Sequence, residues 1–470
     1  MVDITDDKVW KNMFKFSLPL IGIGVVGFLL VLIDLFWLTR LLPGVEVISS
    51  FRVSMASVSF IESIIVGVVT GVGVLFTQYY GAKKYKEAQD IFNGGMISLL
   101  VFGVVASIIG ILLLPVIVSL FGISSEAKVL SKDYLLIFFI GYIIIIVQTY
   151  LFYMARNMGN SLSVLKGLIF MVLLNTVFTP LLIYLFEFLG WGGMKGAASS
   201  TVLSHLLGGI YMFYLFRKMF HTYDIKIQLL SWKKMNKALM KKSIPQAIAQ
   251  TINSISFNLS MFLVIIVLSY YDDTIFIAIT SGLYVIYIFN QVILNFATGL
   301  IPFIGQNIGA GKWENIRKVI KVTFLSVGAM SVFSAIVIFF TKPYALYFIT
   351  NDQQIILLAS QFLNYYLIPW ILSMLTMVAI FTVSGSGDYK GSLLLIVWNM
   401  YISALIPLIV IPRLLSNTEV GVWIAYSTSA ILAFIFSYSY LWIGKWKKVD
   451  LINYNSEQHE KLGEKAYDAG

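Results

Sequence analysis

Two acidic side chains fall inside long apolar runs of the sequence. Asp34 interrupts the run GFLLVLIDLFWL, and Glu62 lies well inside the next run. Ionisable groups within a membrane span are rare and usually functional. Burial disfavours the charged form of a carboxyl group, so such a group can load and release a proton near neutral pH, or hold a cation when charged. The alternative is a neutral carboxylic acid that packs helices together, and Ser59 and Ser63 could satisfy Glu62 locally.

Polar side chains with one aromatic residue follow a single face of a later predicted helix. They occur at i, i+4, i+7 and i+11, on one side of an α-helix, and are Gln246, Gln250, Asn253 and Phe257. Together with Asn290 in the next helix, they line a cleft or join helices, and the sequence leaves both interpretations open. Trp37, one turn beyond Asp34, is the first aromatic candidate for such a cleft, because ring faces attract large cations.

The composition identifies the class of protein that must position these residues. Of 470 residues, 59% are hydrophobic and 12% are charged, whereas soluble domains are about a quarter charged. The chain has no cysteine and three histidines, which excludes thiolate chemistry and argues against a histidine metal cluster. No nucleophile constellation or phosphate loop occurs either. We therefore expect no enzyme, no cofactor and no metal centre.

Apolar runs predict twelve transmembrane helices, and hence an all-α integral membrane fold. Each run is long enough to cross a hydrocarbon core of roughly 30 Å. The runs fall near residues 14–39, 52–77, 91–119, 133–155, 162–186, 196–216, 246–270, 275–303, 319–341, 357–383, 391–412 and 420–443.

The distribution of basic residues predicts the orientation in the membrane. With the N-terminus in the cytoplasm, only seven of the 33 Lys and Arg residues lie outside, as the positive-inside rule requires. We therefore expect a multi-pass plasma-membrane protein, surrounded by lipid, with both termini in the cytoplasm. The same bias explains the net charge of +10, so nucleic acid is not expected as a partner.

The longest polar break divides the spans six and six. Residues 217–243 carry eight basic residues and one aspartate, which positive-inside bias explains, with a lipid-binding or partner-binding patch as the alternative. The sequence thus predicts an N-terminal lobe at 1–216, a cytoplasmic basic linker at 217–243, a C-terminal lobe at 244–445 and a cytoplasmic tail at 446–470. We expect a monomer.

The two halves carry matching segments. TQYYGAKKYKEA (77–88) matches GQNIGAGKWENI (305–316), and RNMGN (156–160) matches SGSGD (384–388), both at an offset of 228 (305 − 77). Copies separated by an even number of spans share one orientation, and such duplicated halves are typical of transporters with a central cleft. The acids have no counterpart, because Ser260 aligns near Asp34 and Asn290 aligns with Glu62.

In their order, these segments resemble the multidrug and toxic compound extrusion (MATE) family over residues 10–445. The resemblance also rests on Pro19 followed by the acid in DLFWLTRLLPGVEVISSFRV, on ARNMGNSLSVLKGLIFMVLLNTVFTPLLIY, and on GMKGAASSTVLSH. It implies a V-shaped pair of pseudo-symmetric six-helix bundles that exports organic cations in exchange for H⁺ or Na⁺.

The resemblance also implies roles for individual residues. Asp34 falls on the family's helix 1 acid, and Asn175 on the asparagine of its helix 5 motif. That motif usually places an aspartate four residues later, where this chain has Thr179, so a sodium ligand is missing. The helix 7 glutamate of another branch corresponds to Asn253. Both departures favour proton coupling at Asp34, and Glu62 is outside the family pattern.

The combined prediction is a secondary active exporter of small organic cations that works by substrate:H⁺ antiport and alternating access. Sodium coupling, with Na⁺ at Asp34 and Asn175, is the first alternative. A lipid-linked precursor flippase of the same superfamily is the second, but it would need a cationic cleft, and the spans contain almost no Lys or Arg.

Overall fold

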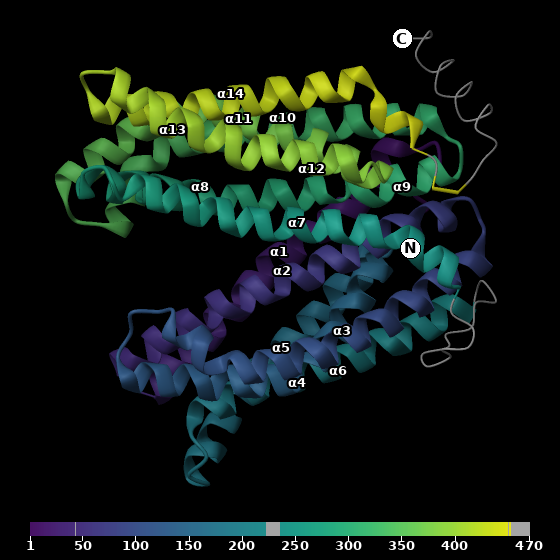
Figure 1. Ribbon diagram of the computed structural model, residues 1–470, viewed down its shortest axis with the longest axis horizontal. Coiled ribbons are helices and arrows are strands. Elements are labelled where there is room, and N and C mark those ends of the chain that lie inside the picture. Colours follow the sequence, from purple (N-terminus) through teal and green to yellow (C-terminus); the bar gives the residue numbers. More distant parts are fainter. Residues whose placement is uncertain (43, 222–235, 450, 453–470) are drawn as a thin grey trace. The chain divides into compact units, whose positions relative to one another are not determined.

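The computed structural model describes residues 1–42, 44–221, 236–449 and 451–452, and within them the fold is entirely helical (Figure 1). Most of the predicted linker and tail lies outside the described residues. The α-helices are α1 (Val9–Leu41), α2 (Val45–Gly81), α3 (Tyr85–Ser119), α4 (Ser125–Asn157), α5 (Ser161–Phe188), α6 (Gly193–His221), α7 (Lys237–Leu268), α8 (Asp273–Thr298), α9 (Leu300–Gly309), α10 (Trp313–Ile349), α11 (Gln353–Ser386), α12 (Tyr389–Val397), α13 (Ser403–Leu414) and α14 (Thr418–Ile443).

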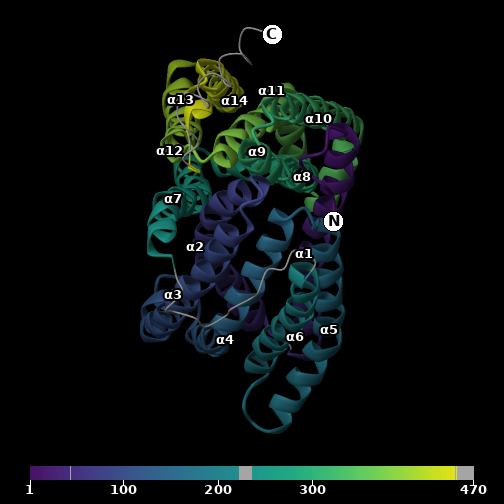
Figure 2. The ribbon, with the colours of Figure 1, turned by 90° about the vertical axis from the view of Figure 1, so that its right-hand side faces the viewer.

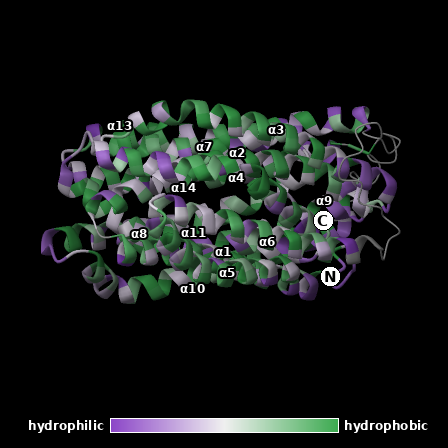
Figure 3. Cartoon of the chain, turned by 90° about the horizontal axis from the view of Figure 1, so that it is seen from below, coloured by the Kyte–Doolittle hydropathy of each residue, from purple (hydrophilic) through white to green (hydrophobic). Residues whose placement is uncertain are grey.

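These helices form twelve segments that are long and apolar enough to cross a membrane, which confirms the predicted number of spans. Hydrophobic residues cover the middle of the helices, and hydrophilic residues gather at both ends (Figure 3). The chain is therefore a multi-pass membrane protein.

Two of the spans are interrupted, which the apolar runs did not show. The eighth span consists of α8 and α9, which meet at Gly299. Pro302 cannot donate a hydrogen bond to the preceding turn, and it is tolerated because it lies in the first turn of α9. The eleventh span consists of α12 and α13 on either side of a π-helical turn at Trp398–Ile402.

The chain divides into two compact units. The first contains Met1–Val2 and Gly22–Ala247, and the second contains Asp3–Ile21 and Ile248–Gly470. Helices α4 and α6 lie side by side in the first unit, as do α13 and α14 in the second (Figures 1 and 2). The start of α1 thus packs with the second unit, and the start of α7 packs with the first.

Glycines at equivalent positions of the two halves allow these exchanged ends to pack closely. A Cβ atom on Gly71 of α2 would lie 2.3 Å from the Ala247 backbone, and one on Gly299 would lie 2.5 Å from Ser17 Oγ. The two glycines are 228 residues apart (299 − 71), the offset of the sequence repeat. Any larger side chain at either position would separate the helices.

The matched loops of the repeat also share a backbone conformation. Gly159 and Gly387 both have positive φ values, of 91° and 85°, a conformation that side chains other than glycine rarely adopt. The next residue then caps the following helix. Asn160 Oδ1 accepts a hydrogen bond from the Ser163 backbone nitrogen, and Asp388 Oδ1 accepts one from the Gly391 nitrogen. The repeat therefore encodes equivalent helix starts.

Candidate functional site

Asp34 lies in the part of α1 that belongs to the first unit, and its side chain is almost fully buried, with 5% of the residue exposed. Thr179 Oγ1 of α5 donates to Asp34 Oδ1 at 3.2 Å, and Thr201 Oγ1 of α6 lies 3.5 Å from Oδ2. The Thr179 hydroxyl also pairs with Ser200 Oγ at 2.8 Å. Two helices, α5 and α6, therefore surround the carboxyl group of α1 with hydroxyl groups.

Asn175, one turn before Thr179 on α5, completes this cluster. Its side chain is fully buried next to the Asp34 carboxyl. Among the described residues, neither Nδ2 nor Oδ1 of the amide completes a hydrogen bond of normal geometry, although the amide faces the Asp34 carboxyl group. Asn175 therefore keeps hydrogen-bonding capacity beside Asp34. The structure thus brings together Asp34, Asn175 and Thr179, three of the residues that the sequence singled out.

Glu62 of α2 lies in the same unit, in a different environment. Within the described chain its carboxyl group takes part in no hydrogen bond or salt bridge, and the residue is only half-buried. The Ser63 hydroxyl donates a hydrogen bond to the Phe60 carbonyl at 2.6 Å, and Ser59 is exposed. The serine neighbours therefore do not satisfy the carboxyl group, which weakens the packing interpretation.

One tyrosine of α4 lies beside Glu62. The Tyr142 hydroxyl donates to the backbone next to it, at the Ile61 carbonyl, over 3.3 Å. Tyr134 of the same helix is 2% exposed and is buried in the unit that holds both acids.

Of the predicted cleft residues, Gln250, Asn253 and Phe257 of α7 and Asn290 of α8 lie in the second unit, whereas Gln246 lies in the first. Asn253 Nδ2 donates to Gln250 Oε1 at 3.4 Å, and both residues are buried. Asn290 of α8 accepts a hydrogen bond from the Trp370 indole at 2.6 Å. Phe257 is 50% exposed. Within the residues that the structure describes, Asn253 Oδ1 and Gln250 Nε2 have no partner, so this face retains hydrogen-bonding capacity.

Trp37 lies near Asp34 in the sequence, but it packs on its own helix. Its ring meets that of Phe36 edge-on, with centroids 5.2 Å apart. The residue is half-buried.

Thr201, Ser200 and Tyr134 were not among the predicted site residues. The two hydroxyl residues fall in GMKGAASSTVLSH, one of the segments with family character, so their spacing was visible but their partner was not. Tyr134 had no distinguishing signal, because tyrosine is frequent in this chain, at 26 residues.

The chemistry available at Asp34 is that of hard oxygen ligands. No group of three or more His, Cys, Asp or Glu residues suited to a metal occurs in the part of the chain that the structure describes. The cluster instead combines one carboxylate with hydroxyl and amide oxygens, which suits a proton or a monovalent cation.

Comparisons with known proteins agree with this architecture. The MatE family model matches residues 19–181 and again residues 250–410, so the same family pattern occurs in both halves. Multidrug export protein MepA of Staphylococcus aureus (strain MSSA476) is 21% identical over 435 residues, which cover 92% of this chain and 94% of that protein. Probable multidrug resistance protein YoeA of Bacillus subtilis (strain 168) is 23% identical over 446 residues, covering 94% and 95%.

Solved structures show the same fold. An outward-facing multidrug resistance MATE family transporter of the MOP superfamily superposes with a TM-score of 0.82 and 21% identity, covering 95% of this chain and 98% of that one. The MATE transporter ClbM in complex with Rb⁺ superposes with a TM-score of 0.78 and 20% sequence identity. The match covers 98% of this chain and 99% of that one. The double family match, the twelve spans and these superpositions together show that the chain belongs to the MATE family of transporters and is not an enzyme.

Proposed function

We propose that this chain exports organic cations in exchange for protons, with Asp34 as the coupling carboxylate. The observation that carries the proposal is the hydroxyl shell of Asp34, contributed by Thr179 and Thr201. MepA and YoeA are described as multidrug export or resistance proteins, which supports the same broad substrate class here.

Hydroxyl partners suit a carboxyl group that changes its protonation state, because a hydroxyl group both donates and accepts. When Asp34 is charged, Thr179 donates to it. When Asp34 is protonated, its own O–H can donate to Thr179, whose hydroxyl then turns to Ser200 Oγ, 2.8 Å away. Both forms of Asp34 therefore keep hydrogen bonds, and a proton can be bound and released without leaving a buried group unpaired.

Glu62 is the second acid of the proposed coupling site. Its carboxyl group forms no hydrogen bond or salt bridge within the described residues, and Tyr142 bonds the backbone beside it. In the charged form, this arrangement also suits an organic cation, because a carboxylate and aromatic faces both attract positive charge.

Sodium coupling is the second candidate, and a specific observation supports it. The Asp34 cluster offers carboxylate, hydroxyl and amide oxygens from Thr179, Thr201 and Asn175. It has a single negative charge, however, because Thr179 occupies the position where the family motif usually has aspartate. We therefore favour the proton.

In the proposed cycle, Asp34 takes up a proton from outside and the substrate leaves. The protein then closes outside, opens inside, loses the proton and accepts a new cation. The predicted lobes 1–216 and 244–445 would perform this change as a monomer in the plasma membrane, with both termini in the cytoplasm. In the C-terminal lobe, the proposed substrate residues are Gln250, Asn253, Phe257 and Asn290.

The test is transport of ethidium, a fluorescent organic cation, by the full chain in proteoliposomes, with the pH and Na⁺ gradients imposed separately. We expect the pH gradient to drive uptake and the Na⁺ gradient to have no effect. Asp34→Asn should abolish this transport, whereas Glu126→Gln, which removes an exposed acid at the start of α4, should retain it. Full transport by Asp34→Asn would refute the role of Asp34. Transport driven by the Na⁺ gradient alone would show that the coupling ion is Na⁺ and not H⁺.

A further inference from the structure

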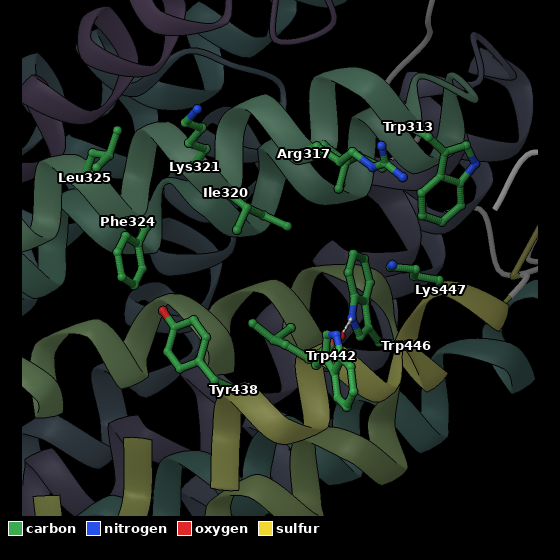
Figure 4. Close-up of a pocket in the computed structure, with 12 residues that line it drawn as sticks. Trp313, Arg317, Ile320, Lys321, Phe324, Leu325, Tyr438, Trp442, Trp446 and Lys447 are labelled. Atoms are coloured by element: carbon green, nitrogen blue, oxygen red, sulfur yellow. Dashed lines mark hydrogen bonds between the residues drawn. The ribbon is translucent and has the colours of Figure 1, made fainter. Parts of the chain in front are cut away.

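A groove lined by apolar and basic side chains runs between α10 and α14 in the second compact unit (Figure 4). It has a volume of about 580 Å³, and the 3-10 helix η3 (Lys445–Lys448) contributes residues to one end. The groove is separate from the Asp34 cluster, which lies in the first unit.

Aromatic rings form much of the groove surface. Phe324 and Tyr438 meet edge-on, with ring centroids 5.8 Å apart. The Tyr438 hydroxyl donates to the Leu375 carbonyl of α11 at 2.9 Å, which fixes the ring and turns its polar atom away from the groove. Trp313 and Trp446 pack at 6.3 Å. The groove therefore presents ordered apolar surface.

Two positive charges meet at one end of this surface. Figure 4 shows Arg317 of α10 and Lys447 of η3 at the end of the groove where Trp313 lies. Burial and the neighbouring Arg317 lower the pKa of Lys447, as expected for cations that share a confined space.

The groove residues supply no opposite charge of their own. In the described chain, no acidic side chain lines the groove. Glu314, in the same turn of α10 as Arg317, forms a salt bridge with Lys318 at 2.6 Å. The charged side chains that line the groove are therefore all basic, and an anion beside Arg317 would be attracted to them.

The apolar part of the groove identifies the kind of anion. Leu325 is 47% exposed and Trp442 is 76% exposed, and both belong to membrane-spanning helices, so this side of the groove opens toward lipid. Arg317 and Leu325 are eight residues apart on one helix (325 − 317), which corresponds to about 12 Å. A small soluble anion would contact the basic end alone, whereas a lipid would cover both parts.

We propose that the groove binds an anionic phospholipid, with its phosphate at Arg317 and Lys447 and an acyl chain along Phe324 and Tyr438. Lys321, one turn beyond Arg317, adds a third positive charge at the margin. Basic residues combined with tryptophan are typical of sites at the level of lipid headgroups.

The test is native mass spectrometry of the full chain in detergent, titrated with phosphatidylglycerol or with phosphatidylcholine that has the same acyl chains. We expect phosphatidylglycerol to bind more tightly. The double variant Arg317→Gln/Lys447→Gln should weaken its binding at least about tenfold. The double variant Arg317→Lys/Lys447→Arg keeps both positive charges and should retain phosphatidylglycerol binding. It therefore distinguishes an effect of lost charge from an effect of misfolding.

A matched control removes two charges from the same elements outside the groove. Lys318→Gln/Lys445→Gln should bind phosphatidylglycerol as the unmodified chain does, because neither residue lines the groove. The site would be refuted if this control lost as much phosphatidylglycerol affinity as Arg317→Gln/Lys447→Gln does. Equal affinity of the unmodified chain for the two lipids would also refute it. Inorganic phosphate that binds as tightly as phosphatidylglycerol would show a soluble-anion site and would also overturn the proposal.

Discussion

Asp34 is held by threonine hydroxyl groups on α5 and α6, and the identity of these partners determines what the carboxyl group can do. A lysine or arginine partner would fix the charged form, since breaking a buried ion pair is costly. Thr179 and Thr201 accommodate both protonation states. The sequence indicated Asp34 because an acid stands out in an apolar run, but it could not show that Thr201, 167 residues away, lies beside it.

Thr179→Val tests the hydroxyl shell. Valine has nearly the shape of threonine but cannot donate to Asp34 Oδ1, so the charged carboxylate loses a buried hydrogen bond that contributes about 1–3 kcal/mol. We expect ethidium transport driven by a pH gradient to fall roughly tenfold. Thr176→Val on the same helix is the control, because the Thr176 hydroxyl donates to the Val172 carbonyl of its own helix. An equal effect of both variants would show that helix packing, and not the bond to Asp34, is responsible.

Thr179→Asp tests the choice of coupling ion. It places a second carboxylate against Asp34, next to the unpaired Asn175 amide, and two carboxylates with neutral oxygens attract a sodium ion more strongly than one. We expect transport by this variant to become Na⁺-dependent in proteoliposomes. Thr179→Asn is similar in shape but neutral and should gain no Na⁺ dependence. A Thr179→Asp variant that stays indifferent to Na⁺ would contradict this account.

At the scale of the helices, the repeat specifies where α5 and α12 begin. The sequence match of RNMGN with SGSGD corresponds to a left-handed glycine followed by a capping side chain in each half. Asp388 also accepts a hydrogen bond from another helix, from the Tyr440 hydroxyl of α14 at 2.5 Å. The second copy thus joins a helix start to its neighbour.

Asp388→Ala should therefore destabilise the second unit. It removes the cap of α12 and leaves the Tyr440 hydroxyl without its acceptor, and loss of a cap alone costs about 0.5–2 kcal/mol. We expect a lower thermal unfolding midpoint in detergent. Asp388→Asn retains an oxygen for the Gly391 nitrogen and should lose less stability. If the Asp388→Ala and Asp388→Asn variants have the same unfolding midpoint, the cap contributes nothing measurable to stability.

Across the whole molecule, the sequence predicted the spans well because their signal is local. Twenty or so apolar residues can be recognised without knowing any neighbour. The interruptions at Gly299 and at Trp398–Ile402 were not predicted, because they involve short turns whose apolar residues match those of a continuous helix. The environment of Glu62 escaped prediction for a different reason, since Tyr142 approaches the neighbouring Ile61 carbonyl from another helix.

The orientation of the whole chain is a prediction from charge alone, and the absence of natural cysteine makes it simple to test. Single cysteines can be placed at Lys86, exposed in the first turn of α3, and at Glu126, exposed in the first turn of α4. The span α3 separates these two positions. The positive-inside rule places Glu126 outside and Lys86 in the cytoplasm. A membrane-impermeant maleimide should therefore label Glu126→Cys on intact cells, and Lys86→Cys only after permeabilisation. The reverse pattern would invert the orientation, and with it the side from which Asp34 takes up its proton.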